Sequence, residues 1–161
     1  MLRRDEFGVP TIRSSFPMGF FGLCLALGVV LRPVAVVSYI MFAIRGVDET
    51  GQTLPGDWHL MFRTLAGVIL IESVLFIITA WYYFNRRKAA RRLVIGTLLF
   101  AIASLVLQTA WTVALADGDE EFIAKTLGPA APAGLIAVAW LVYFWRSKRV
   151  RETLVYPLNA A

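Results

Sequence analysis

The stretch Asn85-Arg86-Arg87-Lys88-Ala89-Ala90-Arg91-Arg92 carries five positive charges in eight residues and no negative charge. Long apolar runs flank this stretch on both sides. A bilayer does not readily take such a cluster across, so the segment is expected to stay on the cytoplasmic side. We therefore interpret it as a tight turn between two membrane-spanning helices, and the orientation of every other segment follows from it.

The composition is that of a polytopic membrane protein. The chain has 161 residues, of which 58% are hydrophobic and 17% charged, and its mean hydropathy is +0.68. Soluble domains carry roughly 25% charged residues, and their apolar residues do not gather into runs of this length. The loops are too short to fold by themselves. We expect one domain over residues 1–161, an all-α integral membrane protein with four transmembrane helices.

The expected spans are the four apolar runs, at about 16–44, 60–84, 93–116 and 129–145. The first run is longer than a hydrocarbon core of ~30 Å requires. Pro33 predicts a kink in it, because proline removes a backbone hydrogen bond. A re-entrant hairpin broken at Pro33 is the alternative. Pro129 and Pro132 are expected to lie in the first turn of the fourth span.

The distribution of Lys and Arg orients these spans. The N-terminal segment has three, the basic turn has five and the C-terminal tail has four, whereas the two opposite loops hold only Arg45 and Lys125. Such a bias over short loops places both termini in the cytoplasm. The same clustering accounts for the net charge of +5, so no nucleic-acid partner is expected. Aromatic residues before the basic turn and the basic tail predict an interfacial belt of Trp81, Tyr82, Tyr83, Phe84, Tyr143, Phe144 and Trp145.

Two charged residues, Arg32 and Glu72, lie near the middle of apolar runs. Each is twelve residues from the outer end of its span, Ile44 or Leu60, which corresponds to the same depth of ~18 Å. An ionisable group at this depth costs at least ~2.5–3.5 kcal/mol and needs a partner. Three interpretations stay open. The residues form a salt bridge that fixes helix packing, they form a proton- or ligand-binding site, or Glu72 is neutral and bonded to a carbonyl or hydroxyl.

The third span carries a polar stripe on one helical face. Its members are Thr97, Ser104, Gln108 and Thr112. Such a stripe is expected to point into the bundle and to form hydrogen bonds between helices. As an alternative, the stripe lines a polar cavity together with Glu72.

A second candidate region is a cytoplasmic basic surface. Its residues are Arg86, Arg87, Lys88, Arg91, Arg92, Lys148, Arg149 and Arg151. Contact with anionic lipid headgroups is the simpler role, and docking of an acidic cytoplasmic partner is the alternative.

No catalytic residues, metal ligands or cofactor ligands stand out. Cys24 and His59 are each the single residue of their type, so two-cysteine zinc motifs and paired histidine ligands are absent. The phosphate loop, the dinucleotide fingerprint and the nucleophile elbow are missing as well. We therefore expect no cofactor, no metal site and no enzymatic activity.

The C-terminal stretch resembles the ending of a known protein family. Trp140, Tyr143-Phe144 and Ser147-Lys148-Arg149-Val150 follow the pattern Trp-x-x-Tyr-Phe-x-x-Ser-Lys-Arg-Val. This pattern is typical of small bacterial four-span inner-membrane proteins catalogued only as a domain of unknown function. Leu31-Arg32-Pro33 resembles the interruption of that family's first span, and Glu72 its mid-helix Glu. The resemblance implies a four-helix bundle in a bacterial inner membrane, and it implies no activity.

Two hypotheses for the function follow. The first is a non-enzymatic accessory or interaction protein that aids a larger membrane complex or its assembly, with a membrane protein or a second copy as partner. The second is a small oligomeric transporter or proton-linked carrier that uses Arg32, Glu72 and Gln108.

Overall fold

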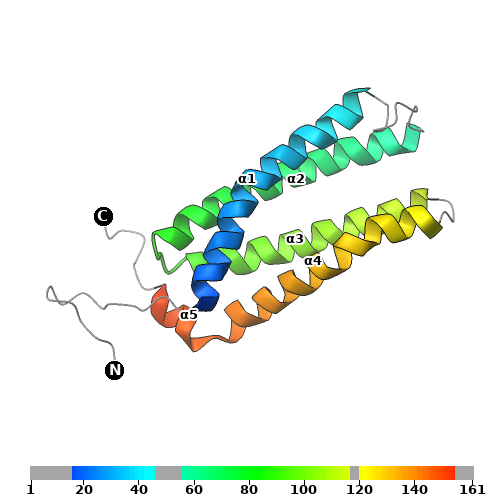
Figure 1. The fold of residues 1–161 in the computed structure, drawn as a ribbon. Coiled ribbons are helices and arrows are strands. Elements are labelled where there is room, and N and C mark those ends of the chain that lie inside the picture. The colour runs from blue at the N-terminus through cyan, green and yellow to red at the C-terminus, as the bar shows by residue number, and fades with distance from the viewer. Residues whose placement is uncertain (1–15, 46–55, 117–119, 155–161) are drawn as a thin grey trace, which may run out of the picture.

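The computed structural model describes residues 16–45, 56–116 and 120–154, and these residues form five helices. The helices are α1 (Phe16–Arg45), α2 (Gly56–Phe84), α3 (Ala90–Leu115), α4 (Glu120–Arg146) and the short α5 (Lys148–Thr153) (Figure 1). Three of them, α1 to α3, are long and apolar enough to cross a membrane, and α4 adds the shorter apolar segment Ala130–Arg146. The predicted all-α membrane bundle is thus confirmed.

The four long helices form two hairpins that diverge. Helix α1 packs along α2, α3 packs along α4, and the hairpins meet through α2 and α3. Near its start, α1 also meets α4, where the Phe21 ring lies 4.9 Å from that of Trp140 and 4.5 Å from that of Phe144. Beyond this point, the hairpins separate toward the end at which α1 and α3 finish and α2 and α4 begin (Figure 1). The bundle is closed at one end and open at the other.

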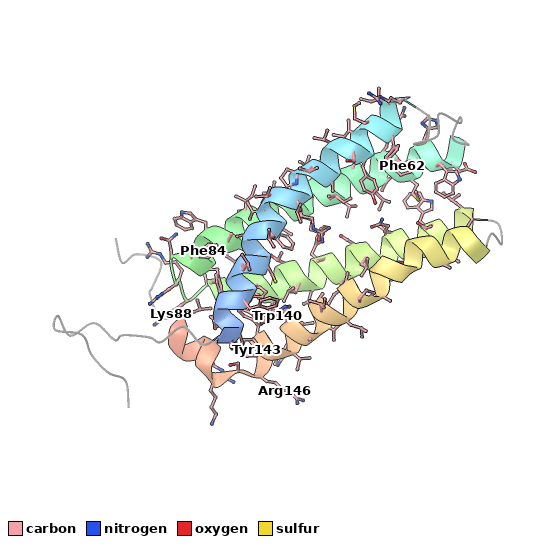
Figure 2. All side chains as sticks on the ribbon, viewed as in Figure 1. Phe62, Phe84, Lys88, Trp140, Tyr143 and Arg146 are labelled. Carbon is pink, nitrogen blue, oxygen red and sulfur yellow. The ribbon has the colours of Figure 1, made fainter. Side chains whose placement is uncertain are left out.

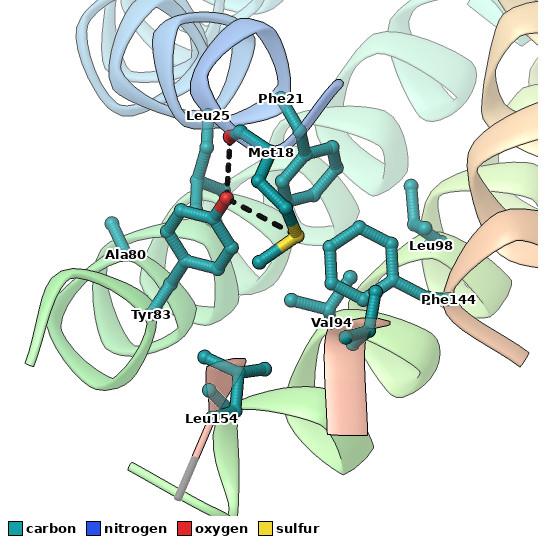
Figure 3. Packing of buried hydrophobic residues seen from close by; sticks show 11 residues of the cluster. Met18, Phe21, Leu25, Ala80, Tyr83, Val94, Leu98, Phe144 and Leu154 are labelled. Atoms are coloured by element: carbon teal, nitrogen blue, oxygen red, sulfur yellow. Dashed lines mark hydrogen bonds between the residues drawn. The ribbon is translucent and has the colours of Figure 1, made fainter. Parts of the chain in front are cut away.

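The buried core lies at the closed end. It brings together the start of α1, the end of α2, the start of α3, the end of α4, and Val150 of α5 with Leu154 directly after that helix (Figure 3). Its members are Met18, Phe21, Leu25, Ala80, Tyr83, Ala90, Val94, Leu98, Phe144, Val150 and Leu154. Lys88 and Arg146 lie at this end, and Phe62 lies toward the other (Figure 2).

The predicted aromatic belt is only partly correct. Tyr83 and Phe144 are buried, and the Tyr83 hydroxyl donates a hydrogen bond to the Met18 carbonyl. Both rings face the bundle and pack against Phe21, and such aromatic contacts are worth about 0.5–1.5 kcal/mol beyond the buried area. In contrast, Trp81 and Trp145 are exposed, as belt residues should be.

A defined cap ends α2 at the basic turn. The Arg86 N–H donates to the Tyr83 carbonyl and the Arg87 N–H to the Tyr82 carbonyl, each at 3.0 Å. These two bonds, together with a φ of 50° at Arg86, form a Schellman motif. The motif reverses the chain within a few residues, so that α3 can begin at Ala90.

The structure settles two predictions about helices, the course of α1 at Pro33 and the start of α4. Helix α1 is continuous from Phe16 to Arg45 with Pro33 inside it, and it bends along its length (Figure 1), so there is no re-entrant hairpin. Helix α4 begins at Glu120, so the prediction that Pro129 opens this helix is wrong.

The C-terminal motif has a structural role. The Ser147 side chain caps α5 by accepting a hydrogen bond of 3.4 Å from the Val150 N–H. Val150 and Leu154 are buried in the core at the closed end. Helix α5 therefore covers the base of the bundle. The segments 1–15, 46–55, 117–119 and 155–161 lie outside the described residues, and the cytoplasmic placement of the termini stays a prediction.

Candidate functional site

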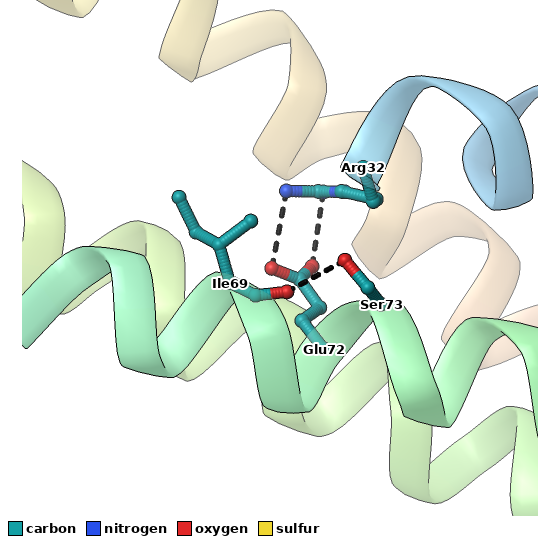
Figure 4. A network of polar contacts seen from close by, with 4 residues as sticks. All are labelled: Arg32, Ile69, Glu72 and Ser73. Carbon is teal, nitrogen blue, oxygen red and sulfur yellow. Dashed lines mark hydrogen bonds and ion pairs between the residues drawn. The ribbon is translucent and has the colours of Figure 1, made fainter. Parts of the chain in front are cut away.

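Arg32 on α1 and Glu72 on α2 form an ion pair within the bundle (Figure 4). The distance from Arg32 Nη2 to Glu72 Oε1 is 2.9 Å, and that from Nη1 to Oε2 is 3.1 Å. Both carboxylate oxygens thus face the guanidinium in a bidentate arrangement, in which Oε2 accepts a hydrogen bond and Oε1 makes an ion-pair contact. The Glu72 side chain is 1% exposed, whereas that of Arg32 is 38% exposed. Glu72 therefore covers one side of the guanidinium, and another side of it stays accessible.

The Phe76 ring helps to hold Arg32 in place. The guanidinium carbon lies 5.5 Å from the centroid of this ring, within the range of a cation–π contact. Phe76 follows Glu72 by one helical turn, so both side chains point toward α1. The ring fits against α1 because Gly28 has no side chain, and a Cβ at Gly28 would lie 2.6 Å from two ring atoms.

Helix α3 adds polar groups to the same region. The Gln108 side-chain amide donates a hydrogen bond of 2.6 Å to the Tyr39 hydroxyl on α1. Nearer the closed end, the hydroxyls of Thr79 and Thr97 lie 2.7 Å apart and join α2 to α3. The Ser104 hydroxyl oxygen is buried and has no hydrogen-bond partner among the described residues. The polar stripe of α3 therefore points into the bundle, and one of its groups is unsatisfied.

Two adjoining cavities surround the ion pair. The smaller, of about 80 Å³, is lined by Arg32, Glu72, Ser104 and Gln108 together with apolar side chains. The larger is an apolar groove of about 660 Å³, to which all four long helices contribute. Arg32 lines both cavities. Arg32 is the one charged residue that lines the groove, and it marks the polar point of the groove. Thr79 and Thr97 also line it, with their hydroxyls bonded to each other, and apart from Cys24 the remaining lining is apolar.

The groove lies between α1 and α4, which have few contacts with each other, and residues of α2 and α3 complete its lining. Phe76 and Thr79 of α2 and Leu98 of α3 contribute to its lining. Leu31 on α1 is 61% exposed and Ile136 on α4 is 57% exposed, and both line the groove. Exposed apolar residues at the rim indicate that the groove opens sideways, toward the lipid phase.

The residues of the basic surface differ in their surroundings. The Arg91 side chain turns inward, and its Nε and Nη2 donate to the carbonyls of Phe144 and Trp145 at 3.0 and 2.9 Å. Arg91 therefore caps the C-terminal end of α4. Arg87 is half-buried. The exposed members are Arg86, Lys88, Arg92, Lys148 and Arg151, and the side chain of Arg149 lies outside the described residues.

The sequence predicted Arg32, Glu72 and Gln108 as site residues, and the structure places all three at the smaller cavity. Phe76, Gly28 and Tyr39 were missed. Spacing offered a signal for each of them: Gly28 lies one turn before Arg32, Phe76 one turn after Glu72, and Tyr39 two turns after Arg32.

Comparison with known proteins gives one match. The model of a family described as "Protein of unknown function (DUF2569)" matches residues 19–155. No curated protein and no solved structure matches the chain.

Proposed function

Because the chain belongs to the DUF2569 family of proteins of unknown function, we propose a function from its geometry: a non-enzymatic membrane protein that binds a small amphiphilic molecule in the α1–α4 groove. Such a protein would act as a small carrier. The observation that supports this proposal is an apolar groove whose lining includes Arg32, the exposed partner of the ion pair.

The dimensions and lining of the groove suit a ligand. Small-molecule sites commonly have ~300–1,000 Å³ and are mostly apolar, with a few polar groups that fix orientation. A groove of about 660 Å³ lies within this range. Arg32, with a side chain 38% exposed, is the polar group available to such a ligand.

The proposed setting is a bacterial inner membrane with both termini in the cytoplasm. Support comes from the exposed basic side chains of Lys88 and Arg92 beside the α2–α3 turn and of Lys148 and Arg151 on α5, which belong to the closed end. Positive charge at one end of a bundle suits the anionic cytoplasmic leaflet. Headgroup contact is the role that we propose for these four residues.

A second candidate function is that of an accessory protein, in which a helix of a partner occupies the same groove. It is favoured by the sparse contact between α1 and α4 and by the exposed small residues Ala131 and Ala133 on α4. Small residues allow close approach of helices in membranes.

Native mass spectrometry of protein released in mild detergent tests both candidates. Ala133→Phe would fill the groove beside Arg32, because Ala133 lines both cavities. Ala131→Phe is the matched control, since Ala131 is equally exposed on α4 but lines neither. We expect a bound small-molecule mass in the wild type and in the control, and its loss in Ala133→Phe.

Two other results would decide against the carrier function. A stoichiometric protein partner that Ala133→Phe displaces would establish the accessory function instead. Equal retention of small-molecule mass by all three proteins, or its absence from all three, would show that the groove is not the ligand site.

A further inference from the structure

We propose that the ligand of this groove is a neutral long-chain amphiphile whose head carries hydrogen-bond-accepting oxygens, and that it enters sideways between α1 and α4. This inference rests on the proposed function and specifies the chemistry of its ligand. Glycerol esters of fatty acids and quinones with an alkyl or isoprenoid tail share this chemistry.

The neutrality of the head follows from the charge at the polar point of the groove. Arg32 is already balanced by Glu72 in a bidentate pair, with distances of 2.9 and 3.1 Å. A carboxylate or phosphate that approached Arg32 would also lie near the Glu72 carboxylate. Like charges repel strongly at such a distance in a low-dielectric site. A neutral head meets no such repulsion.

The acceptor character of the head follows from the surplus of donors. A guanidinium has five N–H donors and no acceptor, and the two contacts with Glu72 leave the other N–H groups of Arg32 available. In the adjoining cavity the Ser104 hydroxyl is buried and has no partner among the described residues. A carbonyl, ester or hydroxyl oxygen would satisfy these donors.

The long chain follows from the shape and lining of the groove. From Arg32 the groove runs past Gly28 and Cys24 to Phe21 and Trp140 near the closed end. Its volume of about 660 Å³ far exceeds the ~150 Å³ of a cavity that holds benzene. An alkyl chain can lie along it with the head at Arg32. The exposed rim residues Leu31 and Ile136 leave a lateral path from the bilayer.

The single cysteine provides a reporter for this test, because Cys24 lines the groove. The rate of its reaction with N-ethylmaleimide is measured for full-length protein in phosphatidylcholine nanodiscs. Three probes are added separately: monooleoylglycerol, its phosphate ester monooleoyl phosphatidic acid, and decylubiquinone. The control protein carries Leu23→Cys and Cys24→Ser, since Leu23 is 58% exposed and does not line the groove.

In the wild type, at a probe concentration about ten times its Kd, we expect the two neutral probes to slow Cys24 labelling by about tenfold. The phosphate ester should slow it less than about twofold at the same concentration. None of the probes should slow labelling of the control. A difference between monooleoylglycerol and decylubiquinone identifies which kind of neutral head is preferred.

Substitution of the ion pair gives the decisive outcome. Glu72→Gln leaves the charge of Arg32 unbalanced, so the order should reverse and the phosphate ester should protect Cys24 best. The double variant Arg32→Gln with Glu72→Gln restores neutrality at the site, so a neutral probe should again protect Cys24 best. This double variant replaces Glu72→Gln in the test if the single variant does not fold.

The two proposals fail differently. If the phosphate ester protects the wild type as well as the neutral probes do, or if Glu72→Gln does not alter the order, the neutral head is wrong and the ligand groove stands. If no probe protects Cys24 in any variant, the proposed function fails as well.

Discussion

At the scale of single residues, removing one partner of the Arg32–Glu72 pair should destabilise the protein far more than replacing both partners. Arg32→Met leaves a carboxylate that is 1% exposed without its partner, and breaking a buried pair in this manner costs about 3–5 kcal/mol. The double variant Arg32→Met with Glu72→Leu should recover most of this loss, because an apolar pair of similar volume needs no charge compensation. Thermal unfolding in detergent measures both. If the double variant is as unstable as Arg32→Met, the loss does not come from an unpaired Glu72 charge, and this explanation is wrong.

Gly28 is a residue whose lack of a side chain positions the ion pair. A Cβ there would lie 2.6 Å from the Phe76 ring, which also contacts Arg32. Gly28→Ala should therefore destabilise the protein by about 1–3 kcal/mol through overpacking. Gly67→Ala is the control, because a Cβ at Gly67 meets no atom within 4 Å, and higher helix propensity should make this variant neutral or slightly more stable. Equal unfolding temperatures of the two variants would contradict the close approach of α1 and α2.

At the scale of helices, Arg91 joins the start of α3 to the end of α4. Arg91→Ala removes two hydrogen bonds to the carbonyls of Phe144 and Trp145. A hydrogen bond to a charged group is worth about 1.5–3 kcal/mol, and the bond to Trp145 is exposed, so that water replaces most of its contribution. We expect a loss of about 2 kcal/mol in the free energy of unfolding, with faster amide exchange at the end of α4. Arg92→Ala removes the same charge from an exposed neighbour and should stay within about 0.5 kcal/mol of the wild type. If both variants lose a similar amount of stability, the effect of Arg91→Ala comes from the lost positive charge and not from the two hydrogen bonds.

Helix positions were largely predictable from the sequence, since apolar runs mark the part of a helix that lies in lipid. The first run, 16–44, corresponds to α1 (Phe16–Arg45). The fourth boundary was missed because α4 extends into polar residues back to Glu120, where composition no longer distinguishes helix from loop. The Schellman cap at Arg86 was also missed, because a positive φ at an arginine leaves no signal in the sequence.

The candidate site was predictable only in part. Equal depth in antiparallel spans was sufficient to relate Arg32 to Glu72. The groove was not predictable, because periodicity shows which face of a helix is apolar and does not show which pair of helices diverges. The contact of Phe76 with Arg32 likewise depends on the close approach of α1 and α2 at Gly28.

At the scale of the whole molecule, the orientation in the membrane is the remaining prediction. The closed end carries the basic turn and α5, and the last residues of α1 and α3 and the first residues of α2 and α4 lie at the opposite end (Figure 1). In a Cys24→Ser background, Lys88→Cys should react with a membrane-impermeant maleimide only after the membrane is permeabilised. Gly118→Cys, in the segment between α3 and α4, should react in intact spheroplasts.

The physical reason for this outcome is the cost of moving five clustered positive charges across the bilayer, which outweighs the effect of the single basic residues Arg45 and Lys125. Labelling of both positions after permeabilisation is the control for accessibility. If Lys88→Cys reacts in intact spheroplasts, the basic turn lies outside. The exposed residues Lys88, Arg92, Lys148 and Arg151 would then face away from the anionic cytoplasmic leaflet, and the proposed headgroup contact would fail while the groove and its ion pair would be unaffected.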